Sequence, residues 1–176
     1  MDVKQLKDEL MEPDWTESLH MKLDELDTSV AAEIVESMDS GEIYQKINHR
    51  QYQNDYIADY IDFIWDISED AYWRHIQVSL DYKVGFLWSD NMSHAEKMCG
   101  HKVPTPVLHA LLNLIVLSND PLNLEPMAEI IKSQVQEHSG MPDIENYIST
   151  LEESQSKLLL SKIKTMLASE SVYDFK

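Results

Sequence analysis

The sequence is poor in the residues that interrupt or cross-link a chain. It holds four glycines, six prolines and one cysteine among 176 residues. So few turn-forming residues favour long helices and argue against a β protein, which needs many tight turns. The single cysteine, Cys99, excludes an internal disulfide framework and is typical of a reducing compartment.

Basic residues are scarce as well. Against 32 aspartates and glutamates the chain has 14 lysines and arginines, which gives a formal net charge of −18. Residues 1–88 carry 20 acids and 7 bases, whereas residues 89–176 carry 12 and 7. Contacts to phosphate need lysine and arginine, so we expect no direct binding to nucleic acid. A charge of this size accelerates encounter with basic partners.

Long apolar runs are absent too. The N-terminal residues are rich in charge and lack the apolar region of a signal peptide. The most apolar run, VLHALLNLIVL at 107–117, is too short to span a bilayer. These absences predict a cytoplasmic protein without a membrane partner. The length of 176 residues and a hydrophobic fraction of 43% predict one domain, residues 1–176, with a substantial core.

Helical periodicity dominates the whole chain. Asp14 and Ser93 each stand three residues before a glutamate and predict capping boxes, and Ser68 and Thr105 are predicted caps of the helices that follow them. Gly140 is predicted to close another helix. The sequence therefore predicts an all-α fold, an irregular multi-helix bundle of roughly seven to nine helices with no β-sheet. The predicted helices cover residues 3–11, 14–38, 51–67, 69–88, 93–100, 105–117, 124–138, 142–152 and 156–169.

The last of these helices has an apolar side, and two roles are open for it. It either closes the core or meets a second copy of the chain. The apolar residues concerned are Leu158, Leu159, Ile163, Met166 and Leu167.

One segment, QYQNDYIADYIDFIWDISEDAYW at 51–73, holds six acids and no base. On one helical wheel the acids fall in an arc of roughly 100°. Like charges four residues apart destabilise a helix by about 0.2–0.5 kcal/mol per pair, and aspartate is a poorer helix former than glutamate. The simplest interpretation of these acids is a solvent-exposed face without a partner. Such a face would have little reason to retain residues that lower the stability of the helix. We call these six residues the acidic stripe: Asp55, Asp59, Asp62, Asp66, Glu69 and Asp70.

Three uses of the acidic stripe are open. It could pair with a basic groove on another protein, imitate the phosphates of nucleic acid, or bind Ca²⁺ or Mg²⁺, for which a straight helix is poorly shaped. Tyr52, Tyr56 and Trp65 could anchor a partner at its edge, although aromatic residues at this spacing are more often core. Four acids of the preceding helix could reinforce it: Asp24, Asp27, Glu33 and Glu36.

One cluster has the residue types of a metal site. His94, Cys99 and His101 lie within eight residues of sequence. A zinc site needs a fourth ligand and a recognised spacing, and neither is present. We therefore predict no cofactor and interpret these residues as a surface loop with ordinary histidines, while keeping them as the metal candidates of this chain.

The other polar clusters in the sequence do not indicate a catalytic site. Glu17 and His20 have the ExxH spacing of helical di-iron proteins, but no second such pair accompanies them. Thr105, His109 and Asn113 line one side of an apolar helix, where we predict a buried hydrogen-bonded seam rather than a catalytic set. The glycine-rich, nucleophile-elbow and calcium-loop motifs are missing. The sequence predicts that the protein is not an enzyme.

The expected function is that of an acidic protein-binding inhibitor. An immunity protein or antitoxin would neutralise a basic bacterial toxin domain, such as a nuclease, by electrostatic and steric occlusion. The alternatives are a nucleic-acid mimic that antagonises a defence enzyme, a helical metal-dependent enzyme, and a plain adaptor.

Overall fold

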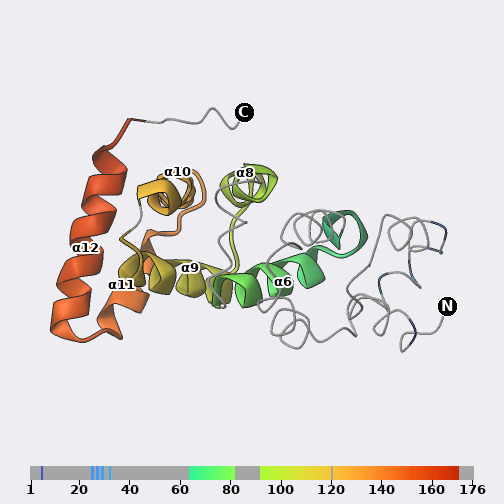
Figure 1. The fold of residues 1–176 in the computed structure, drawn as a ribbon, viewed down its shortest axis with the longest axis horizontal. Coiled ribbons are helices and arrows are strands. Elements are labelled where there is room, and N and C mark those ends of the chain that lie inside the picture. The colour runs from blue at the N-terminus through green and yellow to red at the C-terminus, as the bar shows by residue number, and fades with distance from the viewer. Residues whose placement is uncertain are drawn as a thin grey trace. The chain divides into compact units, whose positions relative to one another are not determined.

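The computed structural model describes residues 64–81, 92–119 and 121–170, together with Gln5, Glu25, Asp27, Ser29 and Ala32. By its contacts the chain divides into two compact units, Met1–Tyr82 and Lys83–Lys176, and each is treated by itself below. The described residues form helices, turns and connecting segments and contain no strand, which confirms the all-α prediction (Figure 1).

The main described element of the first unit is α6, Glu69–Asp81. Residues 64–67 are helical, Ser68 interrupts the helix, and α6 begins directly after it. The Ser68 side-chain oxygen accepts the backbone N–H of Ala71 at 3.2 Å, which is the N-cap bond that the sequence predicts.

The buried side of α6 is aromatic and aliphatic. Tyr72, Trp73, Ile76 and Leu80 are buried, as their spacing predicts. Tyr72 and Trp73 pack edge to face at 5.1 Å between ring centroids, and the Trp65 ring packs edge to face against both of them. Such pairs add about 0.5–1.5 kcal/mol to the gain from burial alone. The last part of the predicted helix, 82–88, lies outside the described residues.

The predicted helix 14–38 is not continuous. Glu25 lies in a turn and Asp27 lies outside any helix, whereas Ser29 is helical. The Asp27 carboxylate accepts the backbone N–H of Ser29 at 3.0 Å and its hydroxyl at 2.6 Å. Short polar side chains compete with the helical backbone in this way and start a new helix instead. The single-helix prediction was therefore wrong at Asp27.

The second unit contains five described helices. They are α8, Met92–Gly100; α9, Thr105–Leu117; α10, Pro121–Gln136; α11, Met141–Ser149; and α12, Glu153–Ala168. Helix α10 packs against α8 and α12, and α9 packs against α11 and α12. Figure 1 shows α12, in red, beside α10 and α11.

Helix α9 supplies the centre of this unit's core. Its seven buried residues include Leu108, Leu111 and Ile115. Apolar side chains of α10 and Ile144 of α11 are buried as well. From α12 the buried residues are Leu159, Ile163 and Met166. Helix α12 thus closes the core of its own unit, whereas Leu158 is 44% exposed.

In the second unit, the described helix ends agree with the sequence to within three residues. The N-cap of α9 is Pro104 rather than the predicted Thr105, which is the first helical residue. Helix α10 begins at Pro121, three residues before the predicted start, because the fixed φ of proline suits the first turn of a helix. Helices α11 and α12 are shifted by one to three residues at their ends.

The turn after α10 is closed by Gly140, but not for the expected reason. The left-handed residue is Ser139, with φ of 55°. Gly140 donates its N–H to the Gln134 carbonyl at 2.7 Å. A Cβ on Gly140 would lie 3.0 Å from that oxygen and 3.1 Å from the Gln134 Cβ. Glycine is favoured there by this close approach rather than by its φ, because a Cβ would force the Gln134 atoms to shift.

Candidate functional site

Half of the acidic stripe lies among the described residues. Asp66, Glu69 and Asp70 are all exposed. The other stripe residues and both tyrosine candidates lie outside the described residues: Asp55, Asp59, Asp62, Tyr52 and Tyr56.

The helix break at Ser68 changes how Glu69 and Asp70 are interpreted. A single helical wheel over 51–73 was wrong, because Asp66 precedes the break and Glu69 and Asp70 follow it. Glu69 and Asp70 occupy the first turn of α6. Carboxylates there are stabilised by the helix dipole, by about 0.3–1 kcal/mol each. These two acids therefore have a local structural role.

Trp65, the candidate aromatic anchor next to Asp66, packs against other aromatic residues. Trp65 is half-buried, and its ring lies edge to face 4.9 Å from Tyr72 and 5.8 Å from Trp73 between centroids. The structure favours the core interpretation of Trp65 over a role at the edge of a binding surface.

Among the reinforcing acids, the structure describes Asp27 alone. Its side chain is exposed. The hydrogen bonds from the Ser29 hydroxyl and backbone lower the pKa of Asp27. Asp24, Glu33 and Glu36 lie outside the described residues.

Two of the three metal candidates belong to helix α8, and the third follows its end. His94 and Cys99 are buried within α8, whereas His101 is exposed, with its Nδ1 2.9 Å from the Lys97 carbonyl. Burial, together with the charges of Glu129, Glu137 and Glu96, raises the pKa of Cys99 to about 12. At neutral pH this sulfur is a thiol, which is a poor metal ligand and nucleophile.

The structure does not bring the three candidates together as a ligand set. No three or more His, Cys, Asp or Glu side chains in the described part of the chain are arranged to hold a metal ion. The surface-loop interpretation was wrong for His94 and Cys99, which α8 turns toward the interior, and is confirmed for His101, which is exposed in the segment after α8.

Sequence reasoning missed a polar cluster at the end of α8. The carbonyl of Cys99 accepts hydrogen bonds from the Ser133 hydroxyl and from His138 Nε2, the latter at 2.8 Å. Both donors come from α10 or from the turn that follows it. They satisfy a carbonyl group that the end of α8 leaves without an intrahelical partner.

Gln134 is the centre of this cluster and is 1% exposed. Its Nε2 donates to the carbonyls of Met98 at 2.7 Å and His101 at 2.9 Å. Its Oε1 accepts the N–H of Val103 at 2.9 Å. With both amide hydrogens and the oxygen engaged, Gln134 acts as a structural clamp on the segment after α8.

Two lysines are engaged at other helix ends. Lys162 of α12 donates to the carbonyls of Ile115 at 2.7 Å, Val116 at 3.3 Å and Ser118 at 2.6 Å. Desolvation lowers the pKa of Lys162. Lys132 of α10 donates to the Ser169 carbonyl at 2.5 Å. Positive charge is favourable at helix C-termini, so these lysines join helices and do not serve as free binding groups.

The predicted polar seam on α9 is not buried. Thr105 and Asn113 are exposed and His109 is half-buried. The prediction failed because the neighbours of α9 leave Thr105 and Asn113 uncovered. The His109 ring packs against Tyr147 of α11, 5.0 Å away between centroids, and desolvation raises the pKa of this tyrosine.

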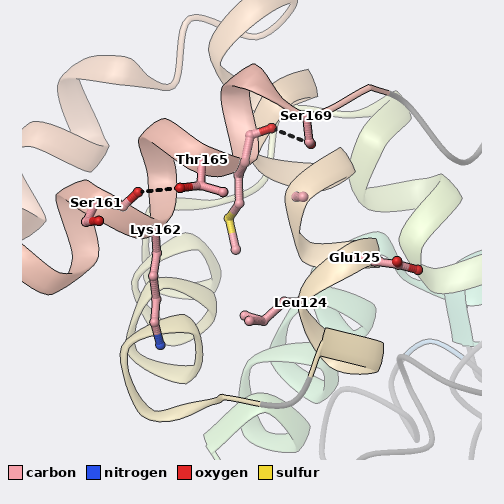
Figure 2. Close-up of a pocket in the computed structure, with 8 residues that line it drawn as sticks. Leu124, Glu125, Ser161, Lys162, Thr165 and Ser169 are labelled. Atoms are coloured by element: carbon pink, nitrogen blue, oxygen red, sulfur yellow. Dashed lines mark hydrogen bonds between the residues drawn. The ribbon is translucent and has the colours of Figure 1, made fainter.

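A pocket of about 320 Å³ lies between α10 and α12. Figure 2 shows the Glu125 side chain directed away from Leu124 and Lys162. The Thr165 hydroxyl donates to the Ser161 carbonyl at 3.1 Å, and the Ser169 hydroxyl donates to the Met166 carbonyl at 2.7 Å. These hydroxyl protons are therefore committed to the backbone of α12. The pocket is lined by Leu124, Glu125, Ala128, Ser161, Lys162, Thr165, Met166 and Ser169.

Comparisons with protein-family models, curated proteins and solved structures gave no match. Within the described ranges no helix has the length and apolar character needed to cross a bilayer.

Proposed function

We propose that the protein is an acidic inhibitor that binds a basic protein partner in the cytoplasm. The class of partner that fits best is a bacterial toxin domain with a nucleic-acid groove, so that the protein would act as an immunity protein or antitoxin. The observation that carries the proposal is the exposure of Asp66, Glu69 and Asp70 around the break at Ser68.

Burial on the opposite side of the same element supports this proposal. Tyr72 and Ile76 are fully buried and Trp73 nearly so, which holds α6 by its apolar side. The acids at its start are thus presented from a packed element. A fixed charge loses less conformational entropy on pairing than a charge on a mobile segment.

The distribution of charge supports it further. Residues 1–88 carry 20 of the 32 acids and 7 of the 14 bases. A field of one sign over one part of a molecule steers a partner of opposite sign and can raise its association rate by about 10- to 1,000-fold. Inhibition of this kind needs no bond to form or break, since the bound protein blocks the partner's groove.

A neutralisation experiment tests the proposal. In the stripe variant, each described stripe acid is replaced by its amide: Asp66→Asn, Glu69→Gln and Asp70→Asn. The control variant removes the same charge from exposed acids of the second unit: Glu137→Gln, Glu145→Gln and Glu170→Gln. Both variants have the same formal net charge, so only the position of the lost charge differs between them.

The parent and both variants are used to capture proteins from the native host, and the captured protein is then assayed for nuclease or other toxic activity. We expect the parent and the control variant to capture one basic protein and to inhibit it at equimolar ratio. The stripe variant is expected to lose capture at moderate salt. Equal capture and inhibition by all three proteins would overturn the assignment of the surface.

A further inference from the structure

We draw no further inference here: the strongest candidate, the open pocket between α10 and α12, is lined mainly by Leu124, Ala128, Met166 and hydroxyl groups committed to backbone carbonyls, and nothing in the structure shows what covers it.

Discussion

The side-chain oxygen of Ser68 accepts the backbone N–H of Ala71 at 3.2 Å, and this bond fixes where α6 begins. It places Glu69 and Asp70 in the exposed first turn, while Tyr72, one turn later, is fully buried. The acidic surface and the aromatic core of the first unit therefore meet at one capped helix start.

Replacing Ser68 by alanine removes this cap. We expect Ser68→Ala to lower the free energy of unfolding by about 1 kcal/mol, because an N–H of the first turn loses its acceptor. Ser68→Thr should retain most of the stability. Urea unfolding followed by tryptophan fluorescence measures the change, since Trp65 and Trp73 pack beside this turn. Ser161→Ala, at an exposed serine inside α12, is the control. Equal stability of Ser68→Ala and the parent would show that the cap contributes nothing.

The Gln134 clamp predicts a larger effect. Gln134→Leu keeps a side chain of similar volume but leaves the Met98 and His101 carbonyls and the Val103 N–H without their partner. Unsatisfied buried polar groups cost about 1–3 kcal/mol each, so we expect a loss of about 2–4 kcal/mol after partial relaxation.

The matched control for this change is Gln136→Leu, at an exposed glutamine on the same helix. Its effect should stay within about 0.5 kcal/mol. Urea unfolding followed by circular dichroism measures both variants. A loss of similar size in the two would contradict the role of Gln134 as a clamp.

Two substitutions in the turn after α10 should change the free energy of unfolding in opposite directions. Ser139→Gly relieves the left-handed conformation of Ser139 at some cost in unfolded-chain entropy, for a net gain of about 0.5 kcal/mol. Gly140→Ala forces a Cβ against the backbone of Gln134 and should cost about 1–3 kcal/mol. Thermal unfolding of both variants tests this pair. A Gly140→Ala protein as stable as the parent would mean that the turn moves freely.

Low pH should destabilise the folded protein because His75 is buried. This residue is 0% exposed, and burial, aided by the charge of Arg74, lowers its pKa to about 3 from about 6.5. Below pH 6.5 His75 becomes protonated in the unfolded chain but stays neutral in the folded chain. The contribution of a neutral His75 is therefore fully present above pH 6.5 and is lost as the pH falls toward 3, by about 1.4 kcal/mol per pH unit.

Comparison with His75→Gln isolates this effect, because glutamine does not titrate. Between pH 7 and 4.5 the parent should lose about 2–3 kcal/mol more than the variant in urea unfolding. Parallel pH profiles for the two proteins would show that His75 is already protonated, or exposed, in the folded state.

The helical class and most helix ends follow from the sequence because their signals are local. Ser68 stands directly before an apolar helical pattern, and the structure makes the predicted cap bond there. Asp27 carries a similar signal, an aspartate two residues before a serine, which apolar periodicity on both sides conceals. Local capping chemistry prevailed over periodicity at that position.

The polar cluster at α8 had no comparable signal. The partners of Gln134 lie 31 to 36 residues away and are backbone groups, which look alike at every position of a sequence. The same holds for Lys162, whose three acceptors are carbonyls at least 44 residues away. Burial of His94 and Cys99 likewise depends on how α8 packs against α10.

For the candidate site, the sequence identified exposed acids correctly at Asp66, Glu69 and Asp70. The predicted helices 51–67 and 69–88 already divide these acids at Ser68, and the single helical wheel was wrong because it ignored that division. Like-charge repulsion along one helix therefore does not apply to Asp66 and Asp70. It stays a prediction for the pairs Asp55/Asp59 and Asp62/Asp66.

The rate of association with the captured basic partner shows whether the acidic stripe steers binding. It should be measured by stopped flow at low and at physiological ionic strength for the parent, the stripe variant and the control variant. We expect the stripe variant to associate about tenfold more slowly than the parent at low salt, and the association rate of the control variant to change by less than about twofold. Equal rates for the stripe variant and the control variant would contradict this expectation, because the position of the acids would then not matter.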